Sequence, residues 1–332
     1  MGERGYRVGV IGATGAVGGE ILDVLEERSF PVADLRAYAS RSGSEIEFQG
    51  QTVEVRAFDP AELARSELLF CAAPGVGAGI LEQVRQADLT LIDVSGSLEL
   101  DPAVPLYLGE LSVFPATGGA RICAIPRGVV AGLALALAPL AREVELTRIT
   151  AVCLEPAIGV GRGGVGELTS QTADILNRLT GDIDESELFP HSLAFECLPL
   201  VGELEKGGAS SEEGRLAHVL RRLLGAPGLP LETTRIRVPT FAGSAAAVHL
   251  ALARGLSVKR AKAIWEKQPR LRVLDADALP TPRSALGHDE VAIGRVRLGG
   301  EDAPGLAFVL VLDDLRRGAA LGAVEAAEAL CR

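Results

Sequence analysis

Near the start of the chain, three glycines have a spacing that suits nucleotide binding: Gly12-Ala13-Thr14-Gly15-Ala16-Val17-Gly18. A glycine turn after a strand lets backbone N–H groups approach a pyrophosphate, which then faces the positive end of the next helix. The spacing is G-x-x-G-x-x-G rather than G-x-G-x-x-G, which is weak evidence alone. Its place between a valine-rich segment, residues 6–11, and a helical pattern, residues 20–28, favours a dinucleotide loop over a tight turn without ligand.

The end of the second predicted strand indicates which dinucleotide would bind. An acidic residue there would bind the ribose hydroxyls of NAD. This chain instead has Ser40-Arg41-Ser42, and a guanidinium between two hydroxyls suits the 2′-phosphate of NADP. The alternative is an exposed surface loop without a ligand, because Arg is common on surfaces.

The pattern of apolar segments predicts two α/β domains. Short apolar runs at 35–39, 68–73, 89–94 and 121–125, separated by helical patterns or loops, predict a Rossmann-type parallel sheet. After residue 128 the pattern changes to a buried helix at 129–141 and several strands, which predict a mixed sheet in a second domain. The glycine-rich segment 159–164 is expected to lack regular structure. The expected division is a dinucleotide-binding domain at 1–128 plus 313–332 and a dimerisation or substrate-like domain at 129–312.

The composition narrows the class of protein. A net charge of −11 without a stripe of Lys or Arg argues against nucleic-acid binding. The longest apolar run, residues 129–141, contains Pro139 and is shorter than the ~20 residues that a bilayer span needs. The five cysteines form no CxxC pair, so we expect buried, reduced thiols, no metal site and a cytoplasmic protein. Residues 1–6 do not resemble a signal peptide.

Several further segments, in the same order along the chain, carry a family resemblance. They are Ala39-Ser40-Arg41-Ser42, Ala72-Ala73-Pro74-Gly75, Asp101-Pro102-Ala103-Val104-Pro105, Gly159-Val160-Gly161, Phe189-Pro190-His191, Arg237-Val238-Pro239 and Leu315-Arg316-Arg317-Gly318-Ala319-Ala320. With the glycine loop, they make nearly the whole chain resemble the aspartate-semialdehyde dehydrogenase family. The resemblance implies a homodimer and a cofactor site at these residues: Gly12, Thr14, Gly15, Ala16, Val17, Ser40, Arg41, Ser42, Ala73, Pro74 and Gly75.

The positions that match the family's catalytic groups carry other residues. The family uses a cysteine thiolate that forms a thioester, a histidine acid/base and a glutamine, and the corresponding positions here are Gly128, Ser244 and Glu155. Glu99 stands where the family has an arginine that resembles a phosphate ligand, and Asp314 where it has an asparagine. These substitutions are most similar to those of the Usg-like paralogues. We therefore expect no catalytic residue to be retained.

Part of the substrate pocket matches the family. Arg237 corresponds to the residue that binds the substrate carboxylate, and Glu213 and Arg215 also match, the latter where a lysine is usual. We expect Arg127 and Glu155 to pair and fill the former thiol position, because an uncompensated buried charge is costly. The alternative is that both side chains reach solvent. Cys123, five positions before Gly128, belongs to a strand and is expected to be a core residue rather than a nucleophile.

Three functions follow from this sequence. The first is a non-catalytic member that retains NADP binding and dimerisation and can regulate an unidentified protein partner. The second is an NADP-dependent oxidoreductase that acts on a small carbonyl without a covalent intermediate, with Glu155 or Ser244 as the acid. The third is an interaction module whose glycine loop binds nothing. The retained glycine loop and Arg41 favour the first over the third.

Overall fold

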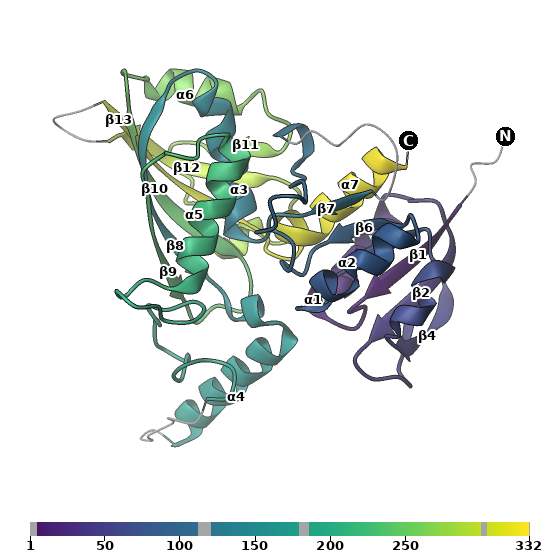
Figure 1. Cartoon of the computed structure of the whole chain (residues 1–332). Coiled ribbons are helices and arrows are strands. Elements are labelled where there is room, and N and C mark those ends of the chain that lie inside the picture. Colours follow the sequence, from purple (N-terminus) through teal and green to yellow (C-terminus); the bar gives the residue numbers. More distant parts are fainter. Residues whose placement is uncertain (1–4, 112–120, 179–185, 300–303, 332) are drawn as a thin grey trace. The chain divides into compact units, whose positions relative to one another are not determined.

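A computed structural model describes residues 5–111, 121–178, 186–299 and 304–331 (Figure 1). The chain divides into two compact units: residues 1–127 with 319–332, and residues 128–318. The sequence division placed residues 313–318 with the first domain, whereas here they belong to the second unit.

The first unit is built on a seven-stranded sheet with the order β3-β4-β2-β1-β5-β6-β7. Its strands are β1 (Tyr6–Ile11), β2 (Val32–Ala39), β3 (Glu45–Phe48), β4 (Gln51–Ala57), β5 (Leu68–Cys71), β6 (Thr90–Asp93) and β7 (Ile122–Ala124). All neighbouring pairs are parallel except β3 and β4, which form an antiparallel hairpin. The predicted Rossmann-type parallel sheet is therefore confirmed, and the hairpin is an addition that the sequence pattern did not show.

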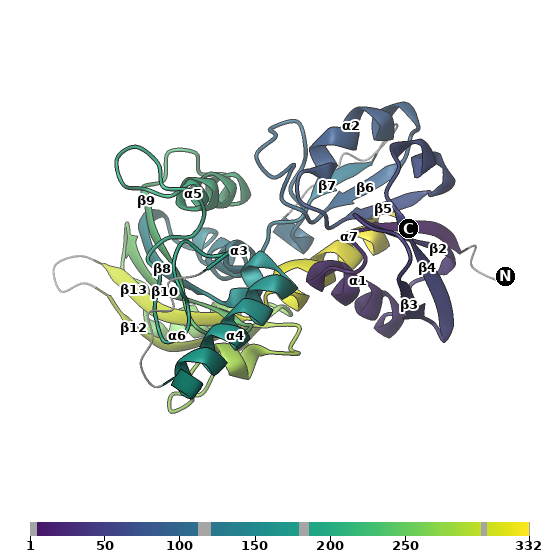
Figure 2. The ribbon, with the colours of Figure 1, turned by 90° about the horizontal axis from the view of Figure 1, so that it is seen from below.

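Helices cover both faces of this sheet (Figure 2). They are α1 (Ala16–Glu27), α2 (Val76–Gln86) and α7 (Leu321–Leu330). Helix α1 buries Ile21, Leu22 and Leu25, which recur at helical spacing and join the core of the sheet. Helix α7 follows a short π-helical turn, Arg316–Ala320, and is a regular α-helix from Leu321.

The second unit contains a six-stranded mixed sheet with the order β11-β12-β13-β10-β8-β9. Its strands are β8 (Leu146–Glu155), β9 (Leu231–Arg237), β10 (Ser244–Leu252), β11 (Leu271–Val273), β12 (Val291–Leu298) and β13 (Gly305–Leu312). The pairs β8–β9 and β11–β12 are parallel and the other pairs are antiparallel. This arrangement confirms the predicted mixed sheet.

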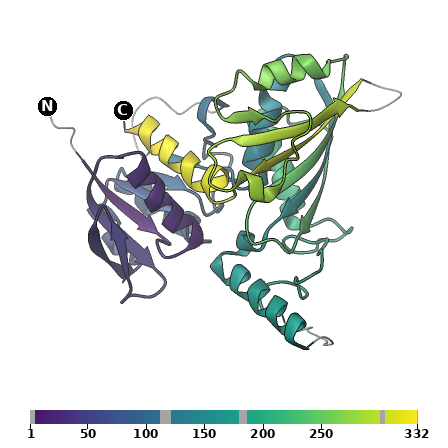
Figure 3. The ribbon, with the colours of Figure 1, turned by 180° about the vertical axis from the view of Figure 1, so that it is seen from behind.

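The helices of the second unit are α3 (Val129–Ala141), α4 (Arg162–Arg178), α5 (Ser211–Leu224) and α6 (Val258–Trp265). Helix α3 is apolar on all sides because it packs against four strands of the sheet and against α5 and α6. In Figure 1, α3 and α5 lie in front of the strands, and Figure 3 shows the strands from the opposite side. Helices thus cover one face of the sheet, and the alternating burial of β8 and β10 leaves side chains of the other face exposed or half-buried.

Two local expectations from the sequence are wrong. Helix α4 begins at Arg162, inside the glycine-rich segment expected to be irregular, because Val165 and Leu168 in its first turns pack against Phe189 and Leu193. The cysteines are also not all buried: Cys197 is exposed and Cys331 is partly exposed, whereas Cys71, Cys123 and Cys153 are buried.

Candidate functional site

The cofactor residues predicted in the first unit gather at one edge of its sheet. The glycine loop follows β1, Ser40 follows β2 and the 72–75 turn follows β5. These three strands are neighbours and parallel, so their carboxyl ends lie at the same edge. β1 lies between β2 and β5, at the point where the order of strands changes direction, which is where open α/β sheets bind ligands.

The glycine loop has the geometry that a phosphate requires. Gly12 has φ +88°, and a Cβ there would lie 3.1 Å from the carbonyl carbon of Ala72. A Cβ on Gly18 would collide with the carbonyl of Gly12, so α1 can pack this close to the end of β1 only because residue 18 is glycine. Gly15 caps α1 without a side chain, which leaves the first N–H groups of the helix for solvent or an anion. These residues fit a dinucleotide phosphate.

The remaining cofactor residues differ in exposure. Thr14, Gly15 and Pro74 are exposed, Val17 and Ala73 are half-buried, and Ala16 is buried. Ser40, Arg41 and Ser42 are all exposed, so the guanidinium is accessible to a 2′-phosphate. Gly75 has φ +77° and caps α2.

Gly128 begins the second unit and caps α3. Its backbone has φ +54° and ψ −135°, and its N–H donates to the carbonyl of Gly318 over 2.7 Å. Within the second unit, a Cβ on Gly128 would meet only Oδ1 of Asp314, at 4.0 Å. The position where the resemblance implies a thiolate therefore has no side chain, and the nearest group within the second unit is the carboxylate of Asp314.

Ser244 and Asp314 form a pair beside this opening. Ser244 is buried at the start of β10, and its hydroxyl donates to Oδ1 of Asp314. Oδ2 of Asp314 is buried and has no hydrogen-bond partner among the described residues. Burial raises the pKa of Asp314 to about 7. The pair can therefore hold or release a proton near neutral pH.

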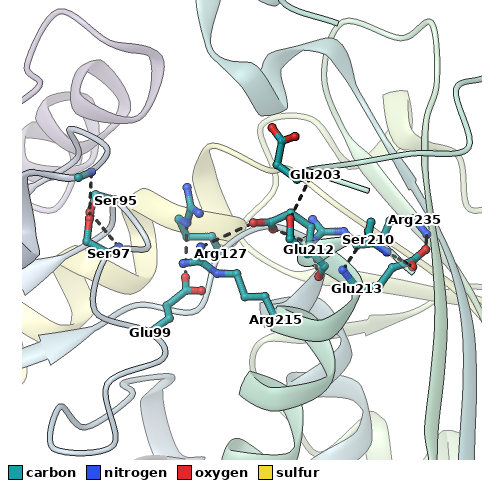
Figure 4. Close-up of polar contacts among 12 residues, drawn as sticks. Ser95, Ser97, Glu99, Arg127, Glu203, Ser210, Glu212, Glu213, Arg215 and Arg235 are labelled. Atoms are coloured by element: carbon teal, nitrogen blue, oxygen red, sulfur yellow. Dashed lines mark hydrogen bonds and ion pairs between the residues drawn. The ribbon is translucent and has the colours of Figure 1, made fainter. Parts of the chain in front are cut away.

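Glu155, at the end of β8, is buried and bound by arginines of β9. Arg235 donates to it through Nε and through Nη2, the latter over 2.8 Å, and Nη1 of Arg237 lies 3.9 Å from Oε2. Arg127 instead contacts Glu99 over 3.4 Å within the first unit (Figure 4). Each side chain has a partner within its own unit, and the pairing of Arg127 with Glu155 stays a prediction.

The three substrate-like residues have protein partners. Arg237 is buried and donates through Nη1 to the carbonyl of Pro156 over 2.7 Å, and burial lowers the pKa of its guanidinium. Glu213 accepts backbone N–H groups from Ser210 at 2.9 Å and from Arg235 at 3.1 Å (Figure 4). Arg215 lies 3.6 Å from Glu212. Glu213 thus completes the capping box of α5.

Two other groups that could do chemistry are structural. Cys123 is fully buried in β7, and burial raises the pKa of its thiol, so it is not a ready thiolate. Arg235, which sequence reasoning missed, is the main partner of Glu155. The sequence alone carried no signal for this pair, because Arg235 is 80 residues from Glu155 and only the structure shows the β8–β9 register that sets Cys153 opposite Arg235.

The described residues contain neither a candidate membrane span nor a candidate metal centre. No helix there is long and apolar enough to cross a membrane. No group of three or more His, Cys, Asp or Glu side chains is arranged there to hold a metal ion.

The fold and the glycine edge define a two-unit protein with a dinucleotide-binding domain. Residues 7–115 match the semialdehyde dehydrogenase NAD-binding domain, and residues 137–317 match the semialdehyde dehydrogenase dimerisation domain. The chain belongs to the semialdehyde dehydrogenase family.

Individual relatives match along the whole chain. A USG-1 protein homolog from Azotobacter vinelandii is 33% identical over 331 residues, covering 98% of this chain and 97% of the relative. An aspartate-semialdehyde dehydrogenase from Synechocystis is 31% identical over 330 residues, with the same coverage of 98% and 97%. The crystal structure of aspartate semialdehyde dehydrogenase II from Vibrio cholerae has a TM-score of 0.89 at 29% identity and covers 99% of both chains. The first unit therefore carries the family's nucleotide-binding domain, and its residues are compatible with NADP.

Proposed function

We propose that this chain binds NADP and self-associates but does not carry out the acyl chemistry of an aspartate-semialdehyde dehydrogenase. The single observation behind the proposal is the backbone at Gly128. A covalent path needs a nucleophilic side chain, and glycine has none. The φ of +54° with ψ of −135° is a region that only glycine adopts readily, so the local backbone suits glycine itself.

The other two altered positions support the same conclusion. Glu155 is bound by Arg235 and flanked by Arg237, so its carboxylate forms ion pairs that connect β8 to β9. Ser244 donates its hydroxyl hydrogen to Asp314. Neither residue offers the free imidazole or amide that the family resemblance implies.

One experiment on a single purified sample tests both parts of this proposal. A phosphate-dependent assay with aspartate semialdehyde and NADP would show no turnover above a blank, and calorimetric titration with NADP would show saturable binding. NAD should bind more weakly, because Arg41 has no 2′-phosphate to contact. Efficient turnover would refute the loss of activity, and absence of binding at millimolar NADP would refute the cofactor.

Self-association is proposed through the open face of the second sheet. Thr150, Val152, Ala247, His249 and Val309 are paired across β8, β10 and β13 and point to this face. All five are partly or fully exposed, and none is a carboxylate, Lys or Arg. An exposed face with this uncharged centre, in the domain matched to the family's dimerisation domain, suits a second copy of the chain; Arg148 and Glu232 lie on the same face beside it.

A second function is favoured by the Ser244–Asp314 pair. Direct reduction of a small carbonyl needs a proton donor beside the developing alkoxide. When Asp314 is protonated, it can donate to Ser244, which then gives its own hydroxyl proton to that oxygen and takes the proton of Asp314; the pKa of Asp314 lies close to neutral. Bound NADPH would supply the hydride. Glu155 is a poorer candidate for the acid, because two arginines stabilise its ionised form.

A screen of small aldehydes and keto acids for NADPH oxidation tests this second function. The expected result is slow turnover that Asp314→Asn and Ser244→Ala both reduce at least tenfold, with a pH profile that falls above about pH 7 in the unaltered chain. Activity that is equal in all three proteins would rule out the pair as the acid.

A further inference from the structure

A chain of hydrogen bonds in the first unit connects a buried carboxylate to the predicted cofactor turn. The hydroxyl of Ser95 donates to Oδ1 of Asp93 over 2.5 Å, and Oγ of Ser95 lies 2.7 Å from Oγ of Ser97. The N–H of Gly75 donates to Oγ of Ser97 over 3.1 Å. Figure 4 shows Ser95 and Ser97 side by side. The connected groups thus lead from the end of β6 to the turn after β5.

The direction of each proton in this chain is determined. Ser95 has one hydroxyl hydrogen, and it goes to the carboxylate of Asp93. The hydrogen shared by the two hydroxyls must therefore come from Ser97. Oγ of Ser97 then presents lone pairs to the N–H of Gly75. Successive hydrogen bonds that point one way polarise each other, so the carboxylate strengthens the bond that holds the turn.

Asp93 is fixed as the anchor of this chain. It is fully buried, and its two oxygens accept the N–H of Ser95 at 3.2 Å and of Leu98 at 3.0 Å. A Cβ on Gly77 would lie 2.7 Å from Oδ1 of Asp93, so the first turn of α2 reaches the carboxylate only because residue 77 is glycine. The N-terminus of α2, the positive end of the helix dipole, stabilises the negative charge of the Asp93 carboxylate.

We propose that Ser97 is a positioning residue of the nucleotide site and that Ser95 and Asp93 act through it. Gly75 is held at φ +77° by this contact, at the strand end beside the glycine loop. A turn that is already ordered loses less conformational freedom when a nucleotide binds. This inference rests on the proposed binding of NADP, and it adds three residues that neither the sequence motif nor the family resemblance marked as cofactor residues.

The test compares NADP affinity, by calorimetric titration, in the unaltered chain and in Ser97→Ala. The expected Kd is about two- to tenfold higher in the variant, the range that one lost hydrogen bond produces. Ser97→Thr keeps the hydroxyl and should restore most of the affinity. Thermal unfolding of all three proteins should agree closely, because Ser97 is only partly buried and the bond orders a surface turn.

Ser66→Ala is the matched control. Ser66 belongs to the same unit and is buried, but its hydroxyl has no hydrogen-bond partner among the described residues and does not reach the turn. It should leave the Kd unchanged. Equal affinity in the unaltered chain and in Ser97→Ala would overturn the inference while the proposed NADP binding stands.

A second measurement separates the two proposals. Hydrogen exchange in the absence of nucleotide should be faster at the Gly75 amide in Ser97→Ala than in the unaltered chain. If the unaltered chain fails to bind NADP, the proposed function and the positioning role both fail, and the exchange result still shows whether Ser97 holds the turn. Unchanged exchange would refute that contact directly.

Discussion

At the scale of residues, the three positions that the family resemblance marks as catalytic each make a local contact in the second unit. Gly128 joins the backbone of Gly318, Ser244 binds Asp314, and Glu155 binds Arg235. Each contact gives a polar group a hydrogen-bond partner. Replacing one of these residues alone is therefore expected to disturb its local contacts.

Gly128→Cys tests whether a thiol placed at position 128 restores the family's chemistry. The expected result is no recovery of phosphate-dependent turnover and a loss of about 1–3 kcal/mol in unfolding free energy, because an L-residue is strained at φ +54°. Urea unfolding and the aspartate-semialdehyde assay measure the two effects. Gly79→Cys is the control: it adds the same thiol on an exposed turn of α2 with open space around it. Full stability and turnover in Gly128→Cys would contradict the argument.

Asp314 gives a pH-dependent prediction. Its pKa is raised from 3.8 to about 7 by burial, so between these values the folded chain binds a proton that the unfolded chain has released. Folding stability from this group therefore falls as pH rises through that window and is constant above it. Asp314→Asn cannot ionise and should be more stable than the unaltered chain, by about 2 kcal/mol more at pH 8 than at pH 5.

Urea unfolding at both pH values measures this effect. Asp34→Asn is a control on an exposed carboxylate of β2 and should show no such gain at pH 8. A stability difference for Asp314→Asn that does not change between the two pH values would show that Asp314 ionises at an ordinary pKa.

At the scale of elements, Arg235 connects three parts of the second unit. It lies on β9, donates to Glu155 on β8, and donates over 2.8 Å to Glu212 in the first turn of α5 (Figure 4). Its backbone N–H also contacts Glu213 of the α5 cap. One buried guanidinium and its carboxylates thus join α5 to the sheet, beside the apolar contacts that α5 makes with α3.

Glu155→Gln should loosen this connection. The change removes a negative charge between two buried arginines and is expected to lower the free energy of unfolding by about 3–5 kcal/mol. Urea unfolding measures it, and hydrogen exchange should rise in α5 and β9. Glu143→Gln breaks an exposed ion pair with Arg260 and should change stability very little. Equal effects of the two variants would contradict a structural role for Glu155.

The sequence predicted the elements with strong periodicity and missed those set by distant contacts. The buried helix at 129–141 and the strand–turn–helix at the glycine loop were predicted because apolar spacing is local. The start of helix α4 was missed because the glycines of 159–164 indicate a loop, although one face of the helix is held by Phe189 and Leu193 farther along the chain. The pairing of Glu155 was also beyond local reasoning, since Arg235 is 80 residues away.

For the whole molecule, the separation into two units has a functional consequence. The predicted nucleotide residues lie at one edge of the first sheet, and positions 128, 155 and 244 all lie in the second unit. Residue changes at these three positions therefore leave the glycine loop and its strands unchanged. The proposed loss of covalent chemistry is in this way compatible with intact nucleotide-binding and dimerisation domains.

The open face of the second sheet gives a prediction about self-association. Val152 lies at the centre of the open sheet face, opposite Ala247 of the next strand, and its exposure of 37% is high for a valine in a central strand. If two copies meet through this face, Val152→Glu places carboxylates in an apolar contact and should shift the chain from dimer to monomer in light scattering at micromolar concentration. Gln51→Glu adds the same charge to an exposed strand of the first unit and should leave the dimer intact.

A monomeric unaltered chain would refute the dimer, whereas a dimeric Val152→Glu would show that the copies meet through another surface. Because the nucleotide edge belongs to the other unit, the monomeric variant should still bind NADP.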